Sequence, residues 1–239
     1  MRTHRLHPWN VSIEQARAIQ KNLSAWIITE GECKPPKMIG RIELICANAN
    51  QASATIQASI SIKSLPSLQL LERKVSVRST DFPAIEGLSA FRKVPAIIAA
   101  LEKLVRVPDL FICDGRGITG PDTFGVASHV GLITNTPTIG VTRAKPRQLS
   151  DLLGNERGSW LPLHEPGQVG ALVRVIDGLD PVMLYPAHKM SMEGAVDALL
   201  RYVPMDMAAH EYLQSLYPES GLPRPGAARL TLVSSSRSS

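Results

Sequence analysis

Three strand-like segments in a row, followed by helices that alternate with strands, restrict the fold of this chain most strongly. The three segments combine β-branched residues with period-two alternation and lie at residues 41–46, 56–62 and 68–77. Leu65-Pro66-Ser67 joins the last two, so together they predict an antiparallel meander. Helical spacing then runs from Leu88 to Leu104, and the apolar run 109–113 follows as a further strand. This order predicts an α/β protein with a mixed sheet.

The rest of the chain continues the alternation. Ser12 and Gln15 have the spacing of a capping box, and apolar residues at helical spacing follow them, so a helix precedes the meander. After the fourth strand, the same patterns predict a helix at 124–133, strands at 138–141 and 182–185, and helices at 191–202 and 206–216. From Glu219 the chain is rich in Pro, Gly, Ser and Arg and is predicted to be disordered. We therefore expect one domain, residues 1–218, and a tail, residues 219–239.

The composition indicates one core and says little about partners. The 239 residues are 44% hydrophobic, enough for one sizeable core without a second domain. The net charge of +5 favours anionic partners, yet an excess of this size also occurs on ordinary proteins. The three cysteines are too scattered for a zinc framework, no apolar stretch approaches the roughly 18 residues of a membrane span, and no signal-peptide pattern opens the chain. We expect a cytoplasmic protein with reduced thiols and no membrane contact.

Asp114 is the residue that first suggests chemistry. It follows the apolar run 109–113 and opens the sequence Asp114-Gly115-Arg116-Gly117, which places a carboxylate at the end of a buried strand beside a glycine-shaped turn. Such a placement suits a catalytic or metal-binding carboxylate, and it also suits a simple turn cap. The amides of Gly115 and Gly117 beside Arg116 form a candidate anion site. Ordinary turn geometry is the simpler interpretation of the two glycines.

Four sequence blocks, in the same order along the chain, resemble the endonuclease V family. They are Phe82-Pro83-Ala84-Ile85-Glu86-Gly87-Leu88-Ser89-Ala90-Phe91-Arg92-Lys93, Pro108-Asp109-Leu110 running into Asp114-Gly115-Arg116-Gly117-Ile118, Phe124-Gly125-Val126-Ala127-Ser128-His129-Val130-Gly131, and Pro137-Thr138-Ile139-Gly140-Val141. The similarity extends from the first helix to Ala209-His210 and includes Pro181 to His188. The resemblance implies a ribonuclease H-like fold of the endonuclease V type, in which an antiparallel meander is followed by alternating helices and strands.

Members of that family cut DNA or RNA near deoxyinosine or inosine, with a divalent metal held by acidic residues. Asp114 and His188 keep the family's residue types. The family's first-strand Asp falls on Cys46 in an ungapped count and on Glu43 in a shifted alignment, and both alternatives stay open. The Glu that closes the family's Phe-Arg-Glu motif is Lys93 here. Because an ammonium group cannot ligate Mg²⁺ and repels it, we expect no metal and no other cofactor.

The residues that would contact nucleic acid also differ from the family. Ala84 replaces the Tyr of the family's Pro-Tyr-Ile-Pro-Gly wedge and cannot stack on a base, and Glu86 repels phosphate. Gly120-Pro121-Asp122-Thr123 stands where the family has His-Pro-Arg-Arg. Arg116 replaces a His and Arg143 a Lys, and with the glycines of the Asp114 turn these arginines form a candidate anion-binding set. We expect only weak, sequence-independent binding of nucleic acid.

Three functions remain open after this comparison. The one we favour is a repurposed enzyme, in which Asp114, Lys93, His188 and Cys46 act as a metal-independent acid/base set on a small anionic metabolite, as in a biosynthetic pathway. The second is an inactive pseudo-nuclease that binds nucleic acid or a protein partner on the inherited surface. The third is a divergent deoxyinosine- or inosine-specific endonuclease. The changes at both the metal site and the wedge favour the first, because an inactive binder would still benefit from its nucleic-acid contacts.

Overall fold

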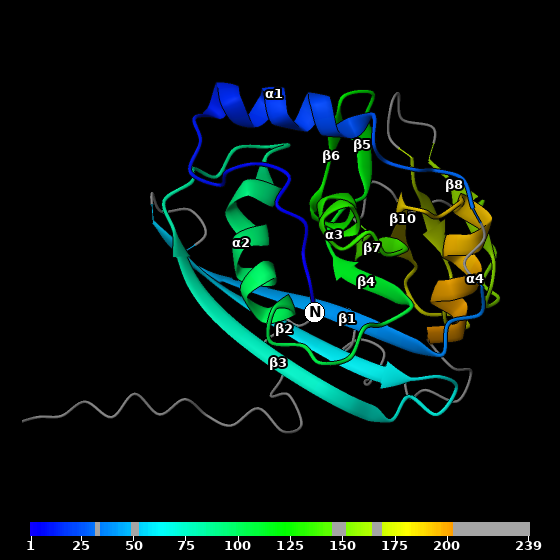
Figure 1. The fold of residues 1–239 in the computed structure, drawn as a ribbon. Helices are drawn as coiled ribbons and strands as arrows, with labels where there is room; N and C mark the ends of the chain where they lie inside the picture. The colour runs from blue at the N-terminus through cyan, green and yellow to red at the C-terminus, as the bar shows by residue number, and fades with distance from the viewer. Residues whose placement is uncertain (32–33, 49–52, 145–151, 164–168, 203–239) are drawn as a thin grey trace, which may run out of the picture.

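A mixed sheet lies at the centre of the fold, with helices on both of its faces (Figure 1). The computed structural model describes residues 1–31, 34–48, 53–144, 152–163 and 169–202. Within these ranges, eight strands pair in the order β3-β2-β1-β4-β7-β10-β9-β8, and β5 and β6 form a separate hairpin. The α/β architecture with a mixed sheet is therefore confirmed.

Four helices and ten strands make up the described part of the chain. The helices are α1 (Ile13–Ser24), α2 (Ser89–Leu101), α3 (Val126–Thr134) and α4 (Met192–Tyr202). The strands before α3 are β1 (Met38–Ala47), β2 (Ala54–Ser64), β3 (Leu70–Thr80), β4 (Leu110–Asp114), β5 (Ile118–Gly120) and β6 (Thr123–Phe124). The strands after α3 are β7 (Thr138–Arg143), β8 (Trp160–Pro162), β9 (Ala171–Val173) and β10 (Val182–His188).

The first three strands form the antiparallel meander that the sequence predicts. β1 pairs antiparallel with β2, and β2 pairs antiparallel with β3. β4 then pairs parallel with β1, and β7 pairs parallel with β4. β10 returns antiparallel to β7. Because β1, β4 and β7 run in one direction, their carboxyl ends point toward the same end of the sheet, where ligands bind in many open α/β sheets.

Apolar side chains alternate along the central strands and build a core on each face. Ile42 packs with α2 and α3 on one face, whereas Ile39 and Ile112 pack with α4 on the other. Successive side chains of a strand point to opposite faces. Arg41 and Glu43 therefore share the α4 face of β1 with Ile39.

Several short elements differ from the prediction. The strands β5, β6, β8 and β9 have two or three residues each, too few to show periodicity in a sequence. Phe124, expected to begin a helix, ends β6 instead, and α3 begins at Val126 after Gly125. The predicted helix 206–216 and the predicted tail 219–239 lie outside the described residues. Among the residues that are described, no helix has the length and apolar character needed to cross a bilayer.

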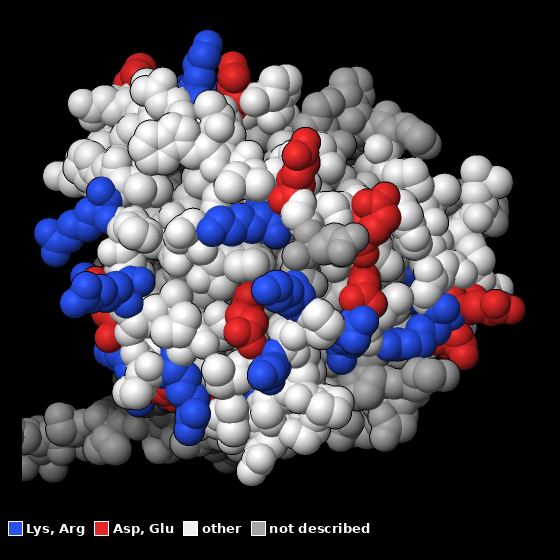
Figure 2. Space-filling model, turned by 45° about the vertical axis from the view of Figure 1, so that its right-hand side comes forward, with Lys and Arg blue, Asp and Glu red and all other residues white. Residues whose placement is uncertain are grey.

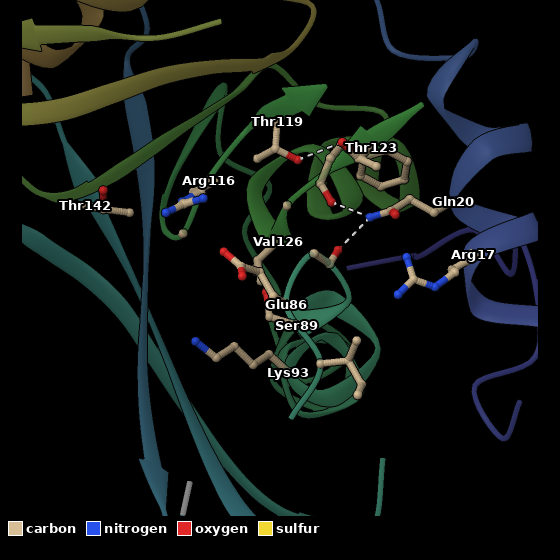
Figure 3. A pocket seen from close by; sticks show the side chains of 15 residues that line it. Arg17, Gln20, Glu86, Ser89, Lys93, Arg116, Thr119, Thr123, Val126 and Thr142 are labelled. Atoms are coloured by element: carbon tan, nitrogen blue, oxygen red, sulfur yellow. Dashed lines mark hydrogen bonds between the residues drawn. The ribbon is translucent and has the colours of Figure 1, made fainter. Parts of the chain in front are cut away.

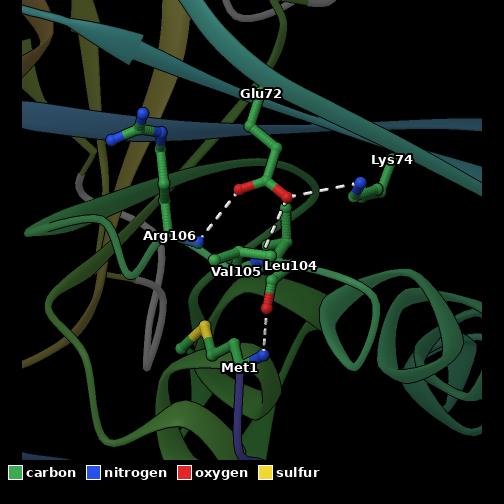
Figure 4. Close-up of polar contacts among 6 residues, drawn as sticks. All are labelled: Met1, Glu72, Lys74, Leu104, Val105 and Arg106. Carbon is green, nitrogen blue, oxygen red and sulfur yellow. Dashed lines mark hydrogen bonds and ion pairs between the residues drawn. The ribbon is translucent and has the colours of Figure 1, made fainter.

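The N-terminal segment is tied down before α1 begins. The amino group of Met1 donates to the carbonyl of Leu104, just beyond α2. Next to it, the carboxylate of Glu72 on β3 accepts the backbone N–H groups of Val105 and Arg106 at 3.1 and 2.9 Å (Figure 4). The start of the chain and the edge strand β3 are thus joined to the same loop.

A pair of histidines joins the N-terminal segment to α3. The Nε2 atoms of His7 and His129 lie 2.8 Å apart, so one ring donates to the other. His129 is fully buried, and the rings of Trp9, Phe91 and Phe124 surround it. Burial, together with the smaller effect of the neighbouring His7, lowers the pKa of His129 to about 3. The pair is therefore neutral at physiological pH.

Candidate active site

Glu43 and Asp114 lie side by side at the carboxyl end of β4. The parallel register pairs Ile42 of β1 with Cys113 of β4, so Glu43 and Asp114 are the next neighbours along the two strands. Adjacent strands are roughly 4.8 Å apart. Burial and, to a smaller extent, the charge of Glu43 raise the pKa of Asp114 to about 6, although the charge of Arg41 opposes this rise. Two acidic groups therefore meet at one point of the sheet.

Cys46, the other candidate for the first-strand position, lies elsewhere. It pairs with Ile56 of β2, three residues beyond Glu43, and packs against the core on the α2–α3 face. Glu43 is on the opposite face of β1. The sheet register therefore places Glu43 beside Asp114, in agreement with the shifted alignment, and does not bring Cys46 to the acidic pair.

Arg41 is the direct partner of Asp114. Its Nη2 donates to Asp114 Oδ1, and the backbone N–H of Leu44 donates to Oδ2 at 3.4 Å. The Arg41 side chain is 3% exposed and that of Asp114 is 18% exposed. The sequence showed a charged residue within an apolar strand, two positions before Glu43, but nothing in it identified Asp114 as the partner.

Lys93 is near Asp114 without replacing Arg41 as its partner. Lys93 is a half-buried residue of α2, and its charge acts to lower the pKa of Asp114. In the part of the chain that the structure describes, the ion pair of Asp114 is made with Arg41 and not with Lys93. Lys93 therefore adds a second positive charge near the acidic pair, which leaves two carboxylates and two cations together.

A cavity of about 530 Å³ opens next to Asp114, between α1, the loop before α2 and the β5–β6 hairpin. Gly115, the residue after Asp114, contributes to its wall. The charged side chains that line it are Arg17, Lys93, Arg116 and Glu86. Arg17 and Lys93 extend into this space from α1 and α2 (Figure 3). With three cations and one carboxylate among the described lining residues, the cavity suits an anionic ligand.

Gln20 holds two walls of this cavity together. It is 3% exposed, and its Nε2 donates to the carbonyl oxygens of Gly87 and Phe124 at 2.8 Å each (Figure 3). Gly87 belongs to the loop before α2, and Phe124 ends the β5–β6 hairpin. One side chain of α1 therefore fixes the spacing between them. No role of Gln20 could be predicted from the sequence, because a Gln in an amphipathic helix is ordinarily a surface residue.

His188 lies away from Asp114. It pairs with Thr138 at the start of β7, whereas Asp114 pairs with Val141, three residues further along the same strand. That separation is about 10 Å along the sheet, and β7 lies between the two residues. Burial lowers the pKa of His188 to about 4, and its Nδ1 accepts the N–H of Ile28 at 3.4 Å. The sheet register therefore does not bring His188, which was expected to act together with Asp114, to the acidic pair.

The candidate anion-binding set is divided in a similar way. Gly115 and Arg116 line the cavity, whereas Gly117 and Arg143 do not. A Cβ atom on Gly117 would overlap the carbonyl oxygen of Pro186, so this glycine permits close packing against β10. Arg143 is exposed at the end of β7. The turn after Asp114 thus offers one arginine to a ligand.

Basic and acidic side chains are interspersed over the surface in Figure 2, which shows no broad single-sign area. The net charge of +5 is therefore not gathered into one stripe on that face. An electrostatic role depends more on the few cations that line the cavity than on the total charge.

Comparison with known proteins gives a consistent result. The family model described as Endonuclease V matches residues 21–208. A protein named Endonuclease V from Trichormus variabilis is 36% identical over 207 residues, which are 85% of this chain and 92% of that protein. Another, from Streptomyces coelicolor, is 34% identical over 82% of this chain and 84% of its own.

Solved structures share the fold. The Endonuclease V of Streptomyces avermitilis has a TM-score of 0.74 at 30% identity and covers 82% of this chain and 86% of its own. The Endonuclease V of Ciona intestinalis, in complex with a 24mer DNA containing an inosine followed by a ribo-adenosine, has a TM-score of 0.65 at 19% identity, covering 82% and 91%. The ribonuclease H-like fold of the endonuclease V type is therefore confirmed.

These relatives overturn the expectation of a repurposed, metal-independent enzyme for a small anionic metabolite. They also contradict the expected loss of nuclease chemistry and the expected restriction to weak, non-specific nucleic-acid binding. The error had a physical source. The substitutions at Lys93 and Ala84 were given more weight than similarity along most of the chain. The first-strand position was also left open between Cys46 and Glu43, whereas the structure places Glu43 beside Asp114. The chain belongs to the Endonuclease V family.

Proposed function

We propose that this chain binds inosine-containing nucleic acid and cleaves its phosphodiester backbone. The observation that carries the proposal is the pair Glu43 and Asp114, neighbours on two central strands beside a cavity lined by three cations. The names of the relatives support it, as does the inosine-containing DNA bound to the Ciona intestinalis protein. We further propose that the protein acts in the cytoplasm, where the thiols of Cys46 and Cys113 remain free.

The acidic pair has the chemistry of a divalent-cation site. Glu43 and Asp114 supply hard carboxylate oxygens from adjacent strands, and Mg²⁺ in nucleic-acid enzymes is often held by one or two carboxylates together with substrate phosphate. A bound divalent ion would activate water and stabilise charge on the phosphate. Among the described residues no group of three or more His, Cys, Asp and Glu is placed to hold a metal ion, so the two carboxylates would need substrate phosphate and water as further ligands.

The other residues of the cavity would bind and orient the strand. Arg17 and Arg116 present guanidinium groups that suit phosphate oxygens. Gln20 keeps the loop before α2 and the β5–β6 hairpin at a fixed spacing. Ala84 has no ring to stack on a base, so the walls of the cavity, rather than an inserted aromatic side chain, would discriminate the base in this chain.

Cleavage of labelled oligonucleotides tests the proposal. A single deoxyinosine in DNA, and a single inosine in RNA, should each be compared with the matching adenosine strand in Mg²⁺ and in Mn²⁺. We expect cleavage near the inosine, lost in Asp114→Asn and in Glu43→Gln. Cys46→Ser is the matched control, because it alters the same strand three residues further along and should keep the activity.

The outcomes separate the alternatives. Equal loss in Cys46→Ser and Glu43→Gln would contradict the assignment of Glu43. Inosine-selective binding without cleavage in either metal would indicate an inactive binder. Absence of both binding preference and cleavage would refute the proposed function.

A further inference from the structure

Arg41 is a charged residue in the interior of the sheet. It lies in the middle of β1, is 3% exposed, and shares the α4 face of that strand with Ile39. Burying a guanidinium group without a partner would be costly, and a paired carboxylate offsets much of that cost. The partner is Asp114, which is one of the two carboxylates proposed to hold a divalent ion.

The contacts of Asp114 show what a cation would have to displace. One carboxylate oxygen, Oδ1, accepts from Arg41 Nη2, and the other, Oδ2, accepts from the backbone N–H of Leu44 at 3.4 Å. The guanidinium is in direct contact with the carboxylate, so a divalent ion at the same oxygen would meet a like charge at close range. Such repulsion is strongest where water is largely excluded.

Glu43 stands next to this pair on the same strand as Arg41. The charges of Asp114, Tyr202 and Glu43 are close enough to act on the guanidinium, and Tyr202 is a buried residue of α4. Arg41 is therefore enclosed by the sheet, the acidic pair and α4.

We propose that Arg41 is the resident counter-ion of Asp114 and competes with a divalent cation for that carboxylate. In this role Arg41 is a positioning residue: it fixes Asp114 in the metal-free protein and sets how strongly Glu43 and Asp114 attract an ion. The inference concerns ion binding in the absence of nucleic acid, so it stands or falls separately from the cleavage activity proposed above.

The competing interpretation is that Arg41 only stabilises the buried carboxylate. Under that interpretation, removing Arg41 weakens folding and leaves ion binding unchanged or weaker. Competition predicts the opposite sign for ion binding, namely tighter binding once the guanidinium is gone. Ion affinity therefore distinguishes the two, whereas stability alone does not.

Titration with Mn²⁺, followed by calorimetry and by the electron paramagnetic resonance signal of free Mn²⁺, tests the proposal on the full chain without nucleic acid. The proteins are the wild type, Arg41→Ala, Arg41→Lys and the double variant Arg41→Ala with Asp114→Asn. Arg201→Ala is the matched control, because Arg201 pairs with Asp197 on the exposed side of α4.

We expect Arg41→Ala to lower the Kd for Mn²⁺ at least tenfold, and the double variant to lose this gain. Arg41→Lys keeps the charge on a shorter, single-point donor and should fall between wild type and Arg41→Ala. Arg201→Ala should bind like the wild type. If Arg41→Ala does not fold, as judged by circular dichroism, Arg41→Lys decides. Unchanged or weaker Mn²⁺ binding in the folded Arg41 variants, or a gain that survives Asp114→Asn, would overturn the proposal.

Discussion

Acid should destabilise this protein through His129, and His129→Phe should remove that part of the effect. His129 is fully buried in α3, with its Nε2 2.8 Å from Nε2 of His7 and with the ring of Phe91 against it. Burial lowers its pKa from 6.5 to about 3. Below pH 6.5, His129 of the unfolded chain therefore binds a proton, whereas His129 of the folded protein does not bind one until about pH 3.

Proton linkage gives the direction and the size of this effect on the free energy of unfolding. A group with a lowered pKa in the folded state contributes stability that is fully present above its unfolded pKa and declines as pH falls. The decline approaches about 1.4 kcal/mol per pH unit for one histidine. Between pH 7 and pH 5, His129 should therefore cost the wild type about 2 kcal/mol of unfolding free energy.

Urea unfolding at pH 7 and pH 5, followed by tryptophan fluorescence, measures this contribution as a difference between proteins. A phenylalanine fits the aromatic surroundings and cannot be protonated, so His129→Phe should lose about 2 kcal/mol less than the wild type over that range. Groups such as His188, whose pKa burial also lowers, titrate in both proteins and cancel. His4→Gln, at an exposed histidine, is the control and should follow the wild type. Parallel pH dependence in wild type and His129→Phe would refute the reasoning.

Three further predictions concern the cavity and its surroundings. Lys93→Glu should tighten Mn²⁺ binding, because a repelling charge near Asp114 becomes an attracting one; calorimetry showing no change would remove Lys93 from the site. Glu86→Gln should tighten binding of an inosine-containing single strand at physiological salt, because a carboxylate no longer faces the backbone; unchanged fluorescence anisotropy would mean that the strand avoids this wall. Gly117→Ala should lower the free energy of unfolding by about 2 kcal/mol through overlap with Pro186, whereas an unchanged urea midpoint would show that β10 can shift.

The long elements of the fold could be predicted from the sequence because each carries enough residues for its period to show. The strands β2 and β3 have 11 residues each, and α2 has 13. The hairpin β5–β6 could not be found, because strands of three and two residues have no period. Because this hairpin forms one wall of the cavity, the site was harder to predict from the sequence than the fold.

Predicting the site required the register between strands that are distant in the sequence, which the periodicity of each segment does not give. Whether Glu43 or Cys46 stands beside Asp114 is decided by the register of β1 against β4, and a shift of one residue in a strand reverses its faces. The distance of His188 from Asp114 depends on the antiparallel direction of β10. The Arg41–Asp114 pair joins strands 73 positions apart in sequence, and no local pattern predicts such a contact.

The two hydrogen bonds of Gln20 bear on where the smallest working unit of this protein begins. The match to the family model starts at residue 21, yet Arg17 and Gln20 both line the cavity. A protein that begins at residue 21 would still match the family model along its length, but it would lack the wall of the cavity that α1 provides. The carbonyl groups of Gly87 and Phe124 would also lose their shared donor. A version trimmed for crystallisation or for fusion to another protein should therefore keep the whole capped helix from Ser12 onward.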